Sequence, residues 1–83
     1  MEISDIVKKY TPLGKKYGSV NENTDNGIYF KTIELGDIKL VYSSCRDGEE
    51  DLDTFYNEAD NADLPKSVRD ELIKDIAQYL LNH

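Results

Sequence analysis

Two runs of β-forming residues flank a two-residue loop, and this pattern constrains the fold more than any other feature of the sequence. Residues 28–35 (IYFKTIEL) and 38–44 (IKLVYSS) are rich in β-branched and aromatic side chains, and Gly36–Asp37 separates them. A two-residue loop of this composition is typical of a tight hairpin turn. It also fixes the register, because Leu35 then lies opposite Ile38.

This register divides the hairpin into two faces of different character. One face collects, with Lys31 as an interruption, Tyr29, Ile33, Leu35, Ile38, Leu40 and Tyr42. The other face collects Phe30, Thr32, Glu34, Lys39, Val41 and Ser43. One apolar and one wetter face are typical of an antiparallel sheet that is buried on one side.

The residues before the hairpin predict a helix and a turn. Apolar residues at helical spacing predict a helix over residues 3–10, which Pro12 is expected to end because proline disfavours helical geometry in the residue before it. Residues 21–27 (NENTDNG) predict a turn by composition. A short strand over residues 16–20 is left open.

Two further helices are predicted after the hairpin. The first, over residues 52–60, is predicted by the spacing of Leu52, Phe55, Tyr56 and Ala59. The second covers residues 68–81. The sequence therefore predicts a single α+β domain, residues 1–83, with an N-terminal helix, an antiparallel β-hairpin or three-stranded meander, and two C-terminal helices packed on one sheet face.

The chain lacks the convergent groups that enzymes use. It has one histidine, His83, and one cysteine, Cys45, and a nucleophile must lie within hydrogen-bond reach of its base. No glycine-rich phosphate loop, nucleophile elbow or zinc-binding helix motif occurs in the sequence. We therefore expect a protein that is not an enzyme and that needs no cofactor.

Acidic side chains are concentrated in one segment. Residues 1–46 hold seven basic and six acidic side chains, whereas residues 47–83 hold three and eleven. Residues 47–63 contain no Lys or Arg and eight carboxylates: Asp47, Glu49, Glu50, Asp51, Asp53, Glu58, Asp60 and Asp63. Unopposed like charges destabilise a compact chain, so we expect that a basic partner surface supplies the missing cations.

On the predicted helix, Asp51 and Glu58 share one flank, and Asp53 and Asp60 share the other. Two alternative roles for the acidic segment are open. A run of charge is commonly a solvated face that keeps a small protein soluble. Residues 47–58 also superficially match the ligand positions of a calcium loop. Leu52 stands where that loop needs glycine, so we expect no specific metal site.

A short, acidic α+β chain without catalytic residues resembles the small phage-encoded inhibitors of host defence, including anti-CRISPR proteins and other nucleic-acid mimics. The eight carboxylates of residues 47–63 carry this resemblance, which is one of style. It implies a non-enzymatic inhibitor that occupies a basic nucleic-acid-binding surface of a partner protein, such as a nuclease or a CRISPR effector, in the cytoplasm of the host cell.

Other partners fit the same sequence. Immunity proteins against nuclease toxins share the same style, and an ordinary interaction domain could form a homodimer through the edge of the hairpin. A net charge of −7 disfavours direct binding to nucleic acid. No segment approaches the ~20 apolar residues of a membrane span, and a lone cysteine fits a reducing cytoplasm. We therefore expect a cytoplasmic protein whose partner is another protein.

Overall fold

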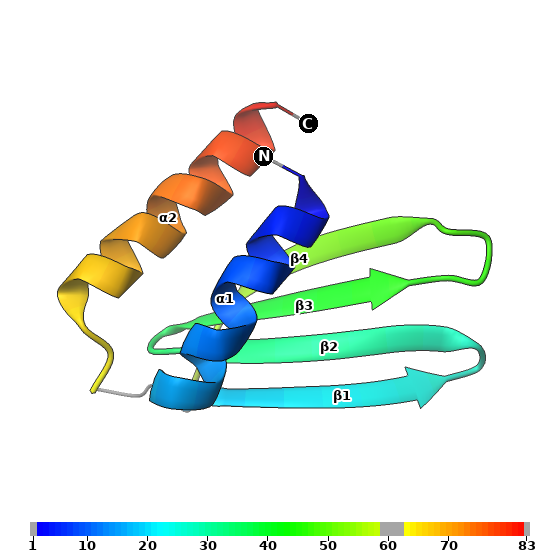
Figure 1. The fold of residues 1–83 in the computed structure, drawn as a ribbon, viewed down its shortest axis with the longest axis horizontal. Helices are drawn as coiled ribbons and strands as arrows, with labels where there is room; N and C mark the ends of the chain where they lie inside the picture. The colour runs from blue at the N-terminus through cyan, green and yellow to red at the C-terminus, as the bar shows by residue number, and fades with distance from the viewer. Residues whose placement is uncertain (1, 59–62, 83) are drawn as a thin grey trace.

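The computed structural model describes residues 2–58 and 63–82, and it shows two helices on one face of a four-stranded antiparallel sheet (Figure 1). The elements in chain order are α1 (Ile3–Tyr17), β1 (Ser19–Asp25), β2 (Ile28–Leu35), β3 (Ile38–Ser44), β4 (Glu50–Tyr56) and α2 (Lys66–Leu81). The strand order is β1-β2-β3-β4. The α+β class and the N-terminal helix are confirmed, but the sheet has four strands, and the described residues contain one helix after it instead of two.

The central hairpin forms in the predicted register. In β2 and β3, Leu35 lies opposite Ile38, and Ile33 lies opposite Leu40. Gly36 has a φ of +59°, as the first loop position of a type II′ turn requires. The predicted apolar face is also confirmed, since Ile33, Leu35 and Leu40 are fully buried.

The segment before this hairpin is strand β1, so the turn predicted over residues 21–27 is wrong for most of its length. β1 pairs with β2 from Ser19 to Asp25, and Asn26–Gly27 joins the two strands. Both loop residues have positive φ, 51° and 80°, and Asn-Gly is the pair that favours a type I′ turn. The turn is therefore confined to two residues, and the polar residues before it form an exposed strand at one edge of the sheet.

Helix α1 continues through Pro12 to Tyr17, so the expectation that Pro12 ends the helix is wrong. A proline inside a helix costs ~3 kcal/mol, because it removes a backbone hydrogen bond and crowds the preceding turn. Burial beyond the proline offsets this cost, since Leu13 and Tyr17 pack against the core.

Residues 50–56 form strand β4, which corrects the helix predicted over residues 52–60. The chain reverses at Asp47–Gly48, where Gly48 has a φ of +86°, and β4 then pairs with β3 along its whole length. A helix here would place like charges on adjacent turns, whereas pairing with β3 satisfies half of the backbone groups of the strand. Residues 59 and 60 of the predicted helix lie outside the described residues.

The core lies between the two helices and one face of the sheet. Helix α2 begins two residues before the predicted start and ends at the predicted residue. The buried apolar residues come from both helices and from three strands, and they are Ile6, Tyr10, Ile33, Leu35, Leu40, Leu52, Leu72 and Tyr79. In the described part of the chain, no helix covers the other face of the sheet.

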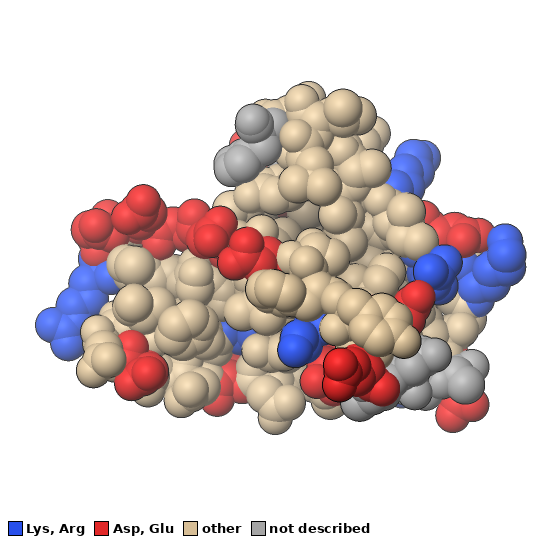
Figure 2. Space-filling model, turned by 180° about the vertical axis from the view of Figure 1, so that it is seen from behind, with Lys and Arg blue, Asp and Glu red and all other residues tan. Residues whose placement is uncertain are grey.

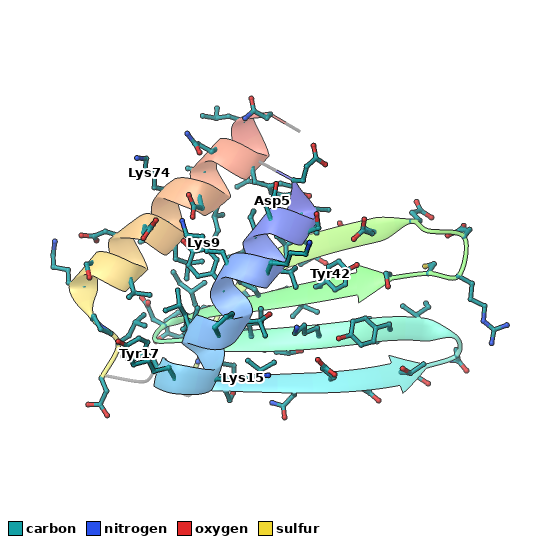
Figure 3. The ribbon with its side chains drawn as sticks, viewed as in Figure 1. Asp5, Lys9, Lys15, Tyr17, Tyr42 and Lys74 are labelled. Atoms are coloured by element: carbon teal, nitrogen blue, oxygen red, sulfur yellow. The ribbon has the colours of Figure 1, made fainter. Side chains whose placement is uncertain are left out.

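A buried carboxylate joins the two helices. Asp75 of α2 is 6% exposed, and it accepts hydrogen bonds from the Tyr10 hydroxyl at 2.6 Å and from the Lys9 ammonium at 2.8 Å. Figure 3 shows Lys9 on the side of α1 that faces α2. Burial alone would raise the pKa of Asp75, but the hydrogen bonds from Lys9 and Tyr10 outweigh it and hold the pKa below its ordinary value.

Candidate protein-binding edge of the sheet

Five carboxylates lie along one edge of the sheet, from the β3–β4 turn into β4. They are Asp47, Glu49, Glu50, Asp51 and Asp53, and we call them the acidic edge. All five are exposed, and β4 is the last strand of the sheet. Figure 2 shows a row of acidic side chains along this edge, beside the face of the sheet that carries no helix. The sequence therefore identified these residues correctly as exposed, but on an element of the wrong type.

The strand changes how these carboxylates are arranged. Successive side chains of a strand point to opposite faces, so Asp51 and Asp53 share the bare face, ~7 Å apart along the strand. Glu50 points to the helix-covered face, where it accepts a hydrogen bond from the Tyr42 hydroxyl at 2.5 Å. The two acidic flanks expected of a helix are therefore replaced by a single pair of carboxylates on the bare face.

The three remaining predicted site residues lie either outside the acidic edge or outside the described residues. Glu58 follows β4 and is exposed, and Asp63 is exposed shortly before α2. Asp60 lies outside the described residues. The pairing of Asp51 with Glu58 and of Asp53 with Asp60 depended on the helix and is not formed, because Asp51 and Asp53 belong to a strand.

The acidic edge differs in ion pairing from five other carboxylates of the chain. Five carboxylates elsewhere lie within 3.7 Å of a cationic nitrogen, and the pairs are Glu22–Lys31, Asp37–Arg69, Asp70–Lys66, Glu71–Lys9 and Asp75–Lys9. Within residues 2–58 and 63–82, no salt bridge involves a residue of the acidic edge. Four cations of the chain pair with carboxylates of other segments, and the acidic edge is left for solvent or for a partner.

The charges of the acidic edge act on two tyrosines. The hydrogen bond to Glu50, together with partial burial, raises the pKa of Tyr42. Burial, and then the negative charges of Asp51 and Asp53, raise the pKa of Tyr79 on α2. The field of the acidic edge therefore reaches the C-terminal half of α2, which packs on the same side of the sheet as Tyr42.

Two aromatic residues at the end of β4 are exposed, which sequence reasoning missed because it placed them in the core. Phe55 is 50% exposed and Tyr56 is 71% exposed. Phe55 lies on the bare face, with the Lys39 ammonium 5.7 Å from its ring centre. The signal that could have revealed them is Asp47–Gly48, since a hairpin turn there makes the following segment a strand.

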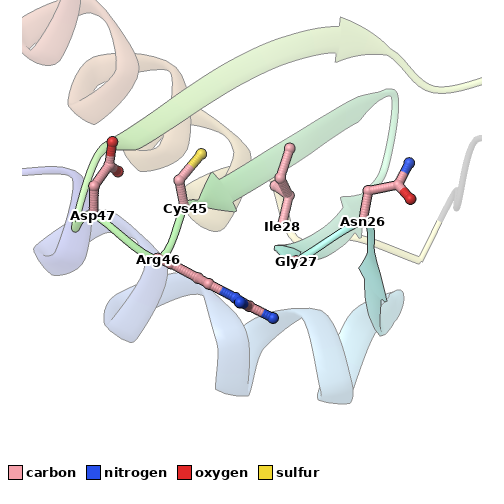
Figure 4. A pocket seen from close by; sticks show the side chains of 6 residues that line it. All are labelled: Asn26, Gly27, Ile28, Cys45, Arg46 and Asp47. Carbon is pink, nitrogen blue, oxygen red and sulfur yellow. The ribbon is translucent and has the colours of Figure 1, made fainter.

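A shallow hollow lies where the β1–β2 and β3–β4 turns meet (Figure 4). Its volume is about 440 Å³, and its lining residues are Asn26, Gly27, Ile28, Cys45, Arg46 and Asp47. Cys45 is a free, half-buried thiol. His83, the one histidine that could act as its base, lies outside the described residues, so the expectation that no Cys45–His83 pair forms stays a prediction.

Metal binding is the other chemistry that carboxylates could support. Among the described residues, no group of three or more His, Cys, Asp or Glu side chains is gathered closely enough to hold a metal ion. The carboxylates of β4 are kept apart because successive side chains of a strand point to opposite faces, so Glu50 lies on one face and Asp51 and Asp53 lie on the other. A calcium loop would instead wrap its ligands around one point.

Calcium should therefore bind to the wild-type protein weakly and no more tightly than magnesium. Calorimetric titration with each ion checks this expectation. The Asp51→Asn/Asp53→Asn variant is the control, because any weak binding to the acidic edge should fall equally for both ions. A calcium-selective site with a micromolar Kd would contradict the prediction.

The comparisons with known proteins supply no relative, since no family model, curated protein or solved structure matches this chain. Neither helix in the part of the chain that the structure describes is long and apolar enough to span a membrane. We therefore infer the function from the acidic edge and its geometry.

Proposed function

We propose that this chain is a non-enzymatic inhibitor whose acidic edge binds a basic, nucleic-acid-binding surface of another protein and excludes nucleic acid from it. Such surfaces carry Lys and Arg to neutralise phosphates, and carboxylates presented in a row can replace those phosphates. CRISPR effectors and nuclease toxins both have surfaces of this chemistry. The protein then acts in the cytoplasm, as a phage-encoded anti-defence protein or as an immunity protein.

The observation that carries this proposal is the run of five exposed carboxylates along one edge of the sheet. Lys9, Lys31, Lys66 and Arg69 are paired with carboxylates of other segments, while the five residues of the acidic edge are exposed and outside every salt bridge of the described residues. A surface that only kept the protein soluble could carry both signs of charge with less repulsion. The acidic edge is therefore better explained as half of an interface.

The alternative of a homodimer through the edge of the central hairpin has less support. β2 and β3 are interior strands, and their outer sides are paired with β1 and β4. The hairpin therefore offers no free edge for a second copy.

The test is competition for a nucleic acid. A CRISPR effector loaded with guide RNA and a nuclease toxin are each bound to fluorescent DNA, and wild-type protein is titrated in. We expect displacement from at least one of them, weaker at 1 M than at 0.1 M salt, because the Debye length falls from ~10 Å to ~3 Å. An edge variant, Glu49→Gln/Asp51→Asn/Asp53→Asn, should compete at least tenfold less well.

The matched control neutralises three exposed carboxylates away from the acidic edge: Asp25→Asn/Asp70→Asn/Glu71→Gln. It has the same net charge as the edge variant, so a difference between them reports position and not total charge. The control should compete as the wild type does. Equal competition by the two variants, or no displacement by wild-type protein from either partner, would show the proposal to be wrong.

A further inference from the structure

One edge of the sheet presents backbone groups that no other strand uses. Two hydrogen bonds at the ends of β4 show which of its residues bond to β3. They run from Cys45 N–H to the Glu49 carbonyl and from Asn57 N–H to the Asp37 carbonyl, and both are 2.9 Å long. Antiparallel strands alternate between residues that bond to the neighbour and residues that point away from it. The β4 residues whose backbone groups point away from β3 are Glu50, Leu52, Thr54 and Tyr56.

This edge is open to solvent. In the described part of the chain, no backbone hydrogen bond joins α2 or any loop to those four residues. Thr54 and Tyr56 lie opposite Leu40 and Ile38, so their side chains are on the helix-covered side of the sheet. Both are nevertheless exposed, Tyr56 by 71%. The helices therefore stop short of the β4 edge and leave room for another strand beside it.

A second copy of this chain is a poor occupant of the edge. Antiparallel pairing of two β4 strands, centred on any residue from 51 to 53, places carboxylates of the acidic edge directly opposite one another. Like charges in such positions destabilise a strand pair. A register centred on Thr54 instead brings Glu50 toward Glu58 of the second copy. Charges on edge strands commonly prevent self-association in this way.

A basic strand meets the opposite situation. Asp51 and Asp53 would occupy non-hydrogen-bonded positions toward an added strand, where facing Cα atoms are only ~4.5 Å apart. Lys or Arg at alternate positions of that strand would therefore face these two carboxylates on the bare side of the sheet. The residues between them would donate backbone N–H groups to the edge and point apolar side chains toward Leu52 and Tyr56.

We propose that β4 accepts an extended basic segment of a partner protein as a fifth strand of the sheet, with Lys or Arg at every second position. The inference deepens the proposed function and rests on it only in taking the partner to be a basic protein. It adds the mode of binding, in which the open backbone edge gives affinity and the acidic edge selects the sequence.

The probe is a capped peptide, acetyl-(Lys-Val)₄-amide, which has the required alternation. Its control, acetyl-(Lys-Pro)₄-amide, carries the same charge but lacks the N–H groups that would bond to β4. We expect the first peptide to bind at least tenfold more tightly. It should also slow amide hydrogen exchange at Leu52 and Thr54, as observed by NMR, and leave Thr24 on the opposite edge unchanged.

Two matched proline variants test the edge directly. Thr54→Pro removes a backbone N–H that points away from β3. Thr24→Pro removes one on β1 that points away from β2. The second assignment follows because the two-residue Asn26–Gly27 loop makes Asp25 and Ile28 a hydrogen-bonded pair, and the next residue, Thr24, therefore points outward. Both residues are exposed, and proline is tolerated at such edge positions. Thr54→Pro should weaken binding of the Lys-Val peptide at least tenfold, and Thr24→Pro should bind as wild type.

The outcomes separate this inference from the proposed function. Equal binding of the two peptides, or unchanged exchange at Leu52 and Thr54, would show that charge alone attracts basic chains. Strand addition would then be wrong, while inhibition through the acidic edge would stand. Peptide binding at the edge combined with failure to displace DNA would instead overturn the proposed function alone. If Thr54→Pro does not fold, the exchange rates of the wild-type protein decide.

Discussion

Replacing Gly18 with alanine is expected to lower the free energy of unfolding by about 3 kcal/mol. Gly18 lies between α1 and β1, and a Cβ there would be 1.8 Å from the carbonyl oxygen of Glu34 and 2.9 Å from its carbonyl carbon. Neither backbone segment can move easily. The Gly18 N–H donates to the Gly14 carbonyl at 2.8 Å, and Glu34 pairs with Ser19 in the sheet. The loss is a large part of the roughly 4–12 kcal/mol expected for a chain of this length.

Urea denaturation of Gly18→Ala and Gly48→Ala provides the comparison. Gly48 has a φ of +86°, and a Cβ there would meet nothing within 4 Å. Alanine at Gly48 therefore suffers only the strain of a left-handed backbone, ~1 kcal/mol. Similar losses in the two variants would mean that the chain around Gly18 relaxes, and would contradict the prediction.

The second large effect is expected at the link between the helices, where Asp75→Ala should cost about 3 kcal/mol. The substitution leaves the fully buried Tyr10 without an acceptor for its hydroxyl and Lys9 without its closest buried partner. Asp70→Ala is the control, because Asp70 pairs with Lys66 on an exposed face of α2 and should cost at most ~0.5 kcal/mol. Equal thermal unfolding of the two variants would contradict a structural role for Asp75.

The same carboxylate makes stability depend on pH. The pKa of Asp75 lies below 3.8 in the folded protein and near 3.8 in the unfolded chain, so the unfolded state binds its proton first as the pH falls. The stabilisation is therefore complete well above pH 3.8 and is lost as the pH falls through the folded pKa. Denaturation curves at pH 7 and pH 3 should show that the free energy of unfolding falls less between these pH values for Asp75→Asn than for wild type. A loss as large as that of wild type would contradict this assignment.

The central hairpin could be predicted residue by residue because two independent signals agree. The Gly36–Asp37 loop sets a register, and that register sorts apolar and polar residues onto different faces. Local and long-range preferences then favour one structure. At Pro12 they disagree, since the local preference is to end the helix and the burial of Tyr17 favours its continuation.

Strand β4 shows why the remainder could not be predicted in the same way. Its positions 52, 55 and 56 fit the core-facing spacing of a helix, yet only Leu52 is buried. An edge strand that lies beyond the helices buries few side chains, so its sequence shows no regular alternation. The Asp47–Gly48 turn was the more reliable signal, because its backbone conformation is local.

The candidate site could likewise be predicted only in part. Charge and exposure can be read from composition, so five of the eight predicted site residues are found exposed along one edge. Their spacing depends on the element that carries them, and the free backbone of β4 depends on which strand is last in the sheet. That order is a tertiary property, and no pattern within residues 47–63 encodes it.

The sequential strand order has a kinetic consequence. Each strand pairs with its neighbour in the chain through a short turn, whereas the Tyr10–Asp75 contact closes a separation of 65 residues. Closing a longer loop costs more conformational entropy, so we expect the sheet to assemble first and the two helices to meet last. Contacts that form after the transition state slow unfolding without speeding folding. The link between the helices therefore sets the lifetime of the folded molecule more than the rate at which it forms.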